Sequence, residues 1–99
     1  RWNEEIEKLC KGEMSHNRAL TQINFMRIYC PPYLLPQVAG YAATLKDDEL
    51  LLPLLEALGW HRQAYTSAQV VPVVEKLMKD TSHSEQVRQE ALKTYKRLK

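Results

Sequence analysis

Glycine, aromatic residues and cysteine are all scarce in this chain. Of its 99 residues only 3 are Gly and 2 are Cys, and aromatic residues make up 8%. With so few glycines, the sequence holds no loop of the kind that cradles phosphate. Alternation of apolar and polar residues never extends beyond a few positions, which argues against a β-sheet. The sequence therefore predicts an all-α protein whose helices are joined by short connections.

Cys10 and Cys30 could form one disulfide, but small secreted domains with thin cores are far richer in cysteine. We therefore expect reduced thiols in an intracellular protein, either cytoplasmic or nuclear. No apolar stretch approaches the roughly 18 residues that indicate a membrane span, and residues 1–5 lack the features of a signal peptide. We expect no contact with a membrane. Charged ends without flexible tails predict a single α-helical domain over 1–99, cut from a longer protein.

Apolar spacing and capping residues predict about six helices. They cover about 2–10, 15–30, 33–45, 47–62, 67–79 and 84–98. The expected N-caps are polar residues, namely Ser15, Asp47 or Asp48, Thr66 or Ser67, and Ser82 or Ser84. Gly12 is expected to stop the first helix, and Pro31-Pro32 the second. On the last helix, the spacing of Val87, Ala91, Tyr95 and Leu98 predicts one buried stripe.

The fourth predicted helix carries leucines around most of its circumference. Such a helix is either central in its fold or covered by something else, and in a unit of six helices we expect it to be central. Trp60 and His61 follow the last of these leucines. Tryptophan is enriched at binding hot spots, so Trp60 is either part of the core or an exposed anchor for a partner.

A proline-centred pattern recurs along the chain as Leu34-Leu35-Pro36, Leu51-Leu52-Pro53 and Val70-Val71-Pro72. The outer two prolines lie 36 residues apart, a distance that fits one pair of helices. Self-similarity at such a period is typical of helical repeat arrays. The alternative is that each proline simply marks the start of a helix.

Residues 70–98 resemble a HEAT repeat: a proline in an apolar first helix, then an aspartate, then Val-Arg-x-x-Ala-x-x-x-aromatic-x-x-Leu. The matching positions are Pro72, Asp80, Val87, Arg88, Ala91, Tyr95 and Leu98. Residues 33–63 are similar more loosely, and residues 1–30 only as a further helix pair. The resemblance to the HEAT/armadillo family implies antiparallel helix pairs stacked into a right-handed bundle or short solenoid. It also implies that Asp80 and Arg88 make polar contacts between repeats.

No pattern of catalytic or metal-ligating residues stands out. His16, His61 and His83 are far apart in sequence, and neither cysteine has a second ligand at metal-site spacing. Asp47, Asp48 and Glu49 could be metal ligands or an acid–base pair, but carboxylates at a helix start are more simply explained as caps. We expect no metal, no cofactor, no small-molecule substrate and no enzymatic activity.

The sequence therefore predicts a protein-interaction module, a scaffold or adaptor segment that binds a partner helix or linear peptide along a groove lined by its second helices. The alternative is a nucleic-acid-associated domain, because residues 64–99 carry seven basic against four acidic residues within a net charge of only +2 for the whole chain. The candidate partner-binding residues are Glu56, Trp60, His61, Arg88, Lys93, Lys96 and Arg97.

Overall fold

The protein is all-α, as predicted. The computed structural model describes residues 2–61 and 64–98, which form six α-helices and one short 3-10 helix. In chain order these elements are α1 (Trp2–Cys10), α2 (His16–Met26), η1 (Pro32–Leu34), α3 (Leu35–Thr44), α4 (Asp48–Trp60), α5 (Ala64–Lys79) and α6 (Glu85–Leu98). Within the described ranges, no helix is long and apolar enough to cross a membrane.

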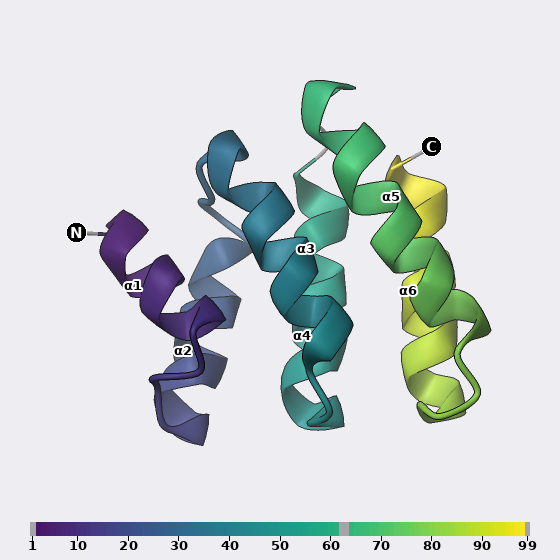
Figure 1. The fold of residues 1–99 in the computed structure, drawn as a ribbon, viewed down its shortest axis with the longest axis horizontal. Coiled ribbons are helices and arrows are strands. Elements are labelled where there is room, and N and C mark those ends of the chain that lie inside the picture. The colour runs from purple at the N-terminus through teal and green to yellow at the C-terminus, as the bar shows by residue number, and fades with distance from the viewer. Residues whose placement is uncertain (1, 62–63, 99) are drawn as a thin grey trace.

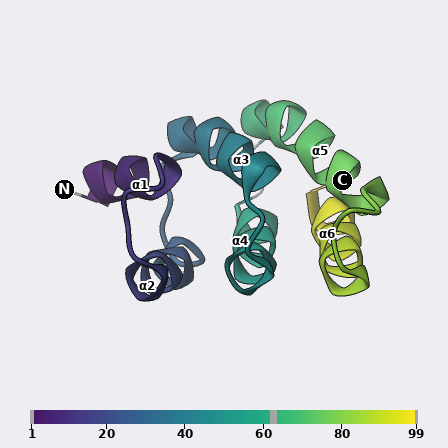
Figure 2. The ribbon, with the colours of Figure 1, turned by 60° about the horizontal axis from the view of Figure 1, so that its bottom comes forward.

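The helices lie in two layers. Figure 2 shows α1, α3 and α5 side by side in one layer, and α2, α4 and α6 in the other. Figure 1 shows that α1, α3 and α5 run downward in that view while α2, α4 and α6 run upward, so consecutive helices are antiparallel. Neighbours contact one another within each layer, α1 with α3, α3 with α5, α2 with α4 and α4 with α6. The result is a row of three helix pairs, measuring 33 × 28 × 18 Å.

The hydrophobic core lies between the two layers, with α4 at its centre. Seven residues of α4 are buried, among them Leu51, Leu54 and Leu55, each 0% exposed. The fully buried Thr94 of α6 donates its hydroxyl to the Leu55 carbonyl at 2.6 Å. Gly59 of α4 lies against Thr94, because a Cβ placed there would stand 3.6 Å from the Thr94 Cα. The expectation that the leucine-rich helix is central is therefore correct.

Polar caps begin three of the helices as predicted. The Ser15 hydroxyl accepts a hydrogen bond from the Arg18 N–H at 3.4 Å, and an Asp47 carboxylate oxygen accepts one from the Glu49 N–H at 3.0 Å. The Ser84 hydroxyl accepts one from the Val87 N–H at 3.3 Å.

The structure confirms the predicted end of α1 but not the predicted start of α5. Gly12 adopts φ 75°, the left-handed conformation that closes a helix C-terminus, so the predicted stop of α1 is confirmed. The predicted N-cap of the fifth helix is wrong, because α5 already begins at Ala64 and Thr66 and Ser67 lie inside it. Serine and threonine lower helix propensity by only a fraction of a kcal/mol (~0.5), which is too little to fix a boundary.

The prolines occupy different depths in their helices. Pro36 lies in the first turn of α3, whereas Pro53 and Pro72 lie inside α4 and α5. The alternative that each proline marks the start of a helix therefore holds for Pro36 but not for Pro53 or Pro72. Pro36 and Pro72 stand on α3 and α5, which are neighbours in one layer and are separated along the chain by one helix pair.

Two further predictions need correction. The second helix ends at Met26, four residues earlier than expected. The proline pair explains only why Cys30 is outside the helix, since a proline disfavours the helical conformation only in the residue before it. Cys30 is nevertheless buried. On α6 the third buried position is Thr94 rather than the predicted Tyr95, which is only partly buried.

Candidate binding surface

Bulky apolar side chains near the end of α2 and in the segment that follows it lie in solvent. Phe25, Ile28, Tyr29 and Tyr33 are 47%, 82%, 50% and 64% exposed. These four residues, here called the 25–33 patch, lie within nine consecutive positions. In the described part of the chain, Trp60 and Leu92 are the other large hydrophobic residues with comparable exposure. Exposed apolar residues concentrated in one short segment are typical of interaction sites.

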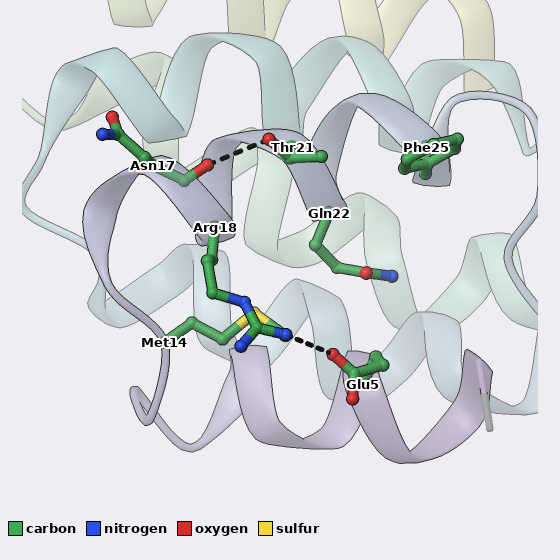
Figure 3. A pocket seen from close by; sticks show the side chains of 7 residues that line it. All are labelled: Glu5, Met14, Asn17, Arg18, Thr21, Gln22 and Phe25. Atoms are coloured by element: carbon green, nitrogen blue, oxygen red, sulfur yellow. Dashed lines mark hydrogen bonds and ion pairs between the residues drawn. The ribbon is translucent and has the colours of Figure 1, made fainter.

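Two hollows lie along α2 and share Phe25 and Thr21 as walls. One lies beside the 25–33 patch and is lined by Thr21, Asn24, Phe25 and Ile28. The other, here called the α1–α2 hollow, has a volume of about 290 Å³. Figure 3 shows the residues that line it, which are Glu5, Met14, Asn17, Arg18, Thr21, Gln22 and Phe25.

Polar contacts occur among the residues that line the α1–α2 hollow. The Arg18 guanidinium on α2 pairs with the Glu5 carboxylate on α1 at 3.3 Å, so the two charges offset each other. Thr21 donates its hydroxyl to the Asn17 carbonyl at 3.0 Å (Figure 3). One side of the hollow therefore carries hydrogen-bonding groups whose charges offset each other. Met14 and Phe25 form its other walls.

Trp60 and Arg97, both predicted as partner-binding residues, lie together. Trp60 is 58% exposed, which makes the reading as a core tryptophan wrong. The guanidinium carbon of Arg97 lies 5.0 Å from the centroid of the indole ring, within the range of a cation–π interaction. The contact joins the ends of α4 and α6 at the surface.

Glu56 and His61 connect α4 to α2. The Glu56 carboxylate pairs with the Arg27 guanidinium at 3.4 Å. The ring of His61 hydrogen bonds through Nε2 to the Met26 carbonyl, and the residue is half-buried. His61 therefore serves to hold the ends of two helices together, and this contact was not foreseen from the sequence.

The basic residues of α6 do not share one face. Arg88 and Arg97 are nine positions apart, which places them on opposite sides of the helix, about 180° apart. Arg88 is half-buried, whereas Lys93, Lys96 and Arg97 are exposed. Lys93 also lines a shallow groove between α4 and α6, together with Leu52, Gln86, Gln89 and Glu90.

Asp80, given an inter-repeat role by the HEAT resemblance, makes local hydrogen bonds and also interacts electrostatically with Lys46, which lies between α3 and α4. Its carboxylate accepts bonds from the Ser82 N–H at 2.9 Å and the Ser82 hydroxyl at 2.6 Å, which lower the pKa of Asp80. The buried His83 also reaches the neighbouring helix pair, since its Nδ1 lies 3.8 Å from Asp48 on α4. Arg88 forms no ion pair with any residue that the structure describes.

His16, Asp47 and Glu49 form a cluster that the sequence did not reveal, because 31 positions separate the histidine from Asp47. Their potential ligand atoms lie within 4.8 Å of one another. His16 Nδ1 is 2.9 Å from Asp47 and Nε2 is 3.2 Å from Glu49. A metal ion would bind only one ring nitrogen, whereas an imidazole between two carboxylates engages both. The cluster is better explained as a contact that joins the starts of α2 and α4.

Neither thiol is set up as a nucleophile. Burial, reinforced by the proximity of Cys30 and Glu7, raises the pKa of Cys10 to about 12. Burial raises the pKa of Cys30 to about 11. A catalytic thiol requires the opposite shift, because the thiolate is the reactive form.

The sequence reasoning missed the 25–33 patch entirely. Comparison of this chain with protein-family models, with curated proteins and with solved structures found no match.

Proposed function

We propose that this chain is a non-catalytic protein-interaction module that binds a helix or linear peptide of a partner along its second helices, with α2 as the principal contact. The observation that carries the proposal is the exposure of Phe25, Ile28, Tyr29 and Tyr33 within one short segment. Aromatic residues dominate the energetics of many protein interfaces, since they contribute a large apolar area at low entropic cost. Trp60 adds a fourth exposed aromatic residue, on the neighbouring helix α4.

The family proposal is that the chain belongs to the HEAT/armadillo type of helical repeat. Its support is the row of antiparallel helix pairs in two layers, together with the sequence pattern of residues 70–98. An intracellular location, cytoplasmic or nuclear, is proposed with it, and the unpaired Cys10 and Cys30 support that location.

Site-specific photo-crosslinking tests the interaction proposal. A photoreactive phenylalanine analogue replaces Ile28 in one variant and the exposed Gln37 of α3 in a matched control. We expect adducts with a partner protein in cell extract at position 28 and not at position 37. We also expect the adduct to be lost when Phe25→Asp is added to the position-28 variant. Equal yields at the two positions would contradict the proposal.

A nucleic-acid role remains the second candidate, favoured by the exposure of Lys93, Lys96 and Arg97 near the end of α6. Phosphate binding by three cations should weaken steeply with salt, with a slope of log K against log salt of about −2 to −3. Lys93→Glu/Lys96→Glu should then abolish binding to a fluorescent oligonucleotide at low salt. If the unmodified chain binds no oligonucleotide even at low salt, this role is ruled out.

A further inference from the structure

The row of helix pairs ends at α5 and α6, and α6 turns one of its sides away from the rest of the row (Figure 2). The buried residues of α6 point into the core. Lys93 and Arg97 lie on the side that faces α4, as their contacts with that helix show. Because an α-helix turns by about 100° per residue, the side away from α4 carries Arg88, Leu92 and Tyr95.

Val71, Glu75 and Met78 hold the matching positions on α5. Each follows a buried residue of α5 by one position, as Arg88 and Leu92 follow buried residues of α6. The two helices are antiparallel and bury sides that face each other, so the same rotation turns both sets of residues toward the same end of the row. These residues together are here called the end face: Val71, Glu75, Met78, Arg88, Leu92 and Tyr95.

The end face is apolar except for one charge of each sign. Leu92 is 39% exposed, and Val71, Met78 and Tyr95 pack against the core but are only partly buried. Arg88 makes no ion pair in the described part of the chain. Glu75 pairs only with Lys79 of its own helix, at 3.7 Å, and its side chain remains 46% exposed. The face therefore has apolar area to bury and two charges to pair.

We infer that two copies of this chain pair through the end face, about a two-fold axis that runs parallel to the helices. Such an axis keeps each residue at its level along the helices and places α5 of one copy opposite α6 of the other. Glu75 lies four residues before the end of α5, and Arg88 lies three residues after the start of α6, so the two stand at one level. In the dimer, Glu75 of each copy therefore meets Arg88 of the other.

The apolar residues match in the same way. Val71 lies eight residues before the end of α5 and Leu92 lies seven residues after the start of α6, so these two side chains also meet across the axis. The interface thus joins two ion pairs and two apolar contacts, all related by the symmetry. Opposite charges at matching positions select this register over its neighbours.

Other pairings of two copies match the charges less well. A two-fold axis perpendicular to the layers packs α5 on α5 and α6 on α6, which keeps Glu75 and Arg88 apart. Head-to-tail stacking would place α1 after α5 and α2 after α6. Arg18 lies two residues after the start of α2, which brings it level with Arg88, and Glu5 would likewise stand level with Glu75. Like charges would then meet in both layers, which is unfavourable.

Sedimentation velocity tests the pairing. Over a series of rising concentrations we expect the mass to increase from one copy of 11.5 kDa toward two copies and no further, because a two-fold interface closes on itself. Leu92→Asp places a charge among the apolar residues of the end face and should keep the chain monomeric throughout the series. Circular dichroism checks that this variant is folded.

Charge reversal provides a sharper test. Arg88→Glu brings two carboxylates together in each pair and Glu75→Arg brings two cations together, so each variant alone should dimerise at least about 10-fold more weakly. An equimolar mixture of the two variants should form a heterodimer as strong as the unmodified dimer, because the introduced charges then face each other and the native ones do the same. Lys96→Glu makes the same charge change on an exposed part of α6 and is the matched control, which should dimerise normally.

Three results would overturn the inference. The first is a chain that stays monomeric over the whole series. The second is a mixture that associates no better than its separate variants, which would mean that the two charges act within one chain. The third is tighter association of Arg88→Glu, the result expected of head-to-tail stacking because the change removes the repulsion from Arg18.

The inference does not depend on the proposed function. The 25–33 patch lies on α2 and the segment that follows it, away from α5 and α6, so the dimer leaves the patch uncovered and presents it twice (Figure 1). If the chain dimerises but position 28 forms no crosslink, only the interaction module is wrong. If position 28 crosslinks to a partner in a chain that stays monomeric, only the dimer is wrong.

Discussion

At the scale of single residues, one hydroxyl group connects two helices that lie side by side in the structure. Thr94 is fully buried on α6, and its hydroxyl bonds to a carbonyl of α4 rather than to its own helix. Thr21 is its counterpart at the surface, since its hydroxyl bonds to the Asn17 carbonyl within α2. The pair allows the same chemical change to be compared in a buried and an exposed position.

We expect Thr94→Val to lower the free energy of unfolding by about 1 kcal/mol, because the change keeps the shape and removes one buried hydrogen bond. Thr21→Val should change it by less than about 0.5 kcal/mol. Urea unfolding followed by circular dichroism measures both. Equal losses for the two variants would mean that the bond between Thr94 and Leu55 adds nothing to stability.

The thiols give a second prediction at this scale. Their pKa values rise from 9.0 to about 12 for Cys10 and about 11 for Cys30. At pH 8 the folded chain should therefore react with an aromatic disulfide reagent about 100-fold or more slowly than the chain in guanidinium, since reactivity follows the thiolate fraction. Because the neutral thiol is the favoured form, its contribution to stability is complete below pH 9 and declines as the pH rises toward 11–12. Cys10→Ala and Cys30→Ala assign the two rates, and rapid labelling of the native chain would contradict the prediction.

At the scale of helices, the prolines offer the sharpest comparison. Pro72 lies inside α5 and is exposed, so it deprives the helix of one hydrogen bond without filling the core. Pro36 lies in the first turn of α3, where an N–H would have no partner within the helix.

Pro72→Ala should therefore stabilise the chain by about 1–2 kcal/mol, less than the roughly 3 kcal/mol cost of an interior proline because the unfolded chain also gains freedom. Pro36→Ala should be neutral or slightly destabilising. Thermal unfolding of the two variants provides the measurement. Stabilisation by Pro36→Ala of the same size would show that depth in the helix is not the cause.

Helix positions were largely predictable from the sequence, but surfaces were not. The bounds of α1 and the caps Ser15 and Asp47 followed from local patterns of few residues. The 25–33 patch depends on where α2 ends, and the contact of Trp60 with Arg97 depends on how α4 packs against α6. The same holds for His16 and Asp47, which meet only because α2 and α4 are neighbours. Such contacts between segments distant in sequence have no local signature.

At the scale of the whole molecule, the stability of a helix depends on whether it lies at the centre or at the end of the row of helix pairs. The central helix α4 contacts α2, α3 and α6 and contributes seven buried residues. The end helix α1 contacts mainly α2 and α3 within the described structure, and both contacts are smaller than those of α4 with α2 and α6. Stability in such an arrangement depends mainly on interfaces between neighbours, so it is not uniform.

Hydrogen exchange should reveal this gradient. We expect the amides of α4 to exchange at least about 10-fold more slowly than those of α1, because α1 can open while the rest of the row stays folded. Mass spectrometry of peptic fragments resolves the two helices. If α1 and α4 exchange at one common rate, the chain unfolds only as a single unit.

Trp60 has an optical consequence. A largely exposed indole emits at long wavelength, and a guanidinium group over its ring alters the intensity, so the fluorescence of this residue reports on the junction of α4 and α6. With Trp2→Phe as background, the emission has a single source. The chain thus carries its own spectroscopic label beside the surface through which it is proposed to meet a partner.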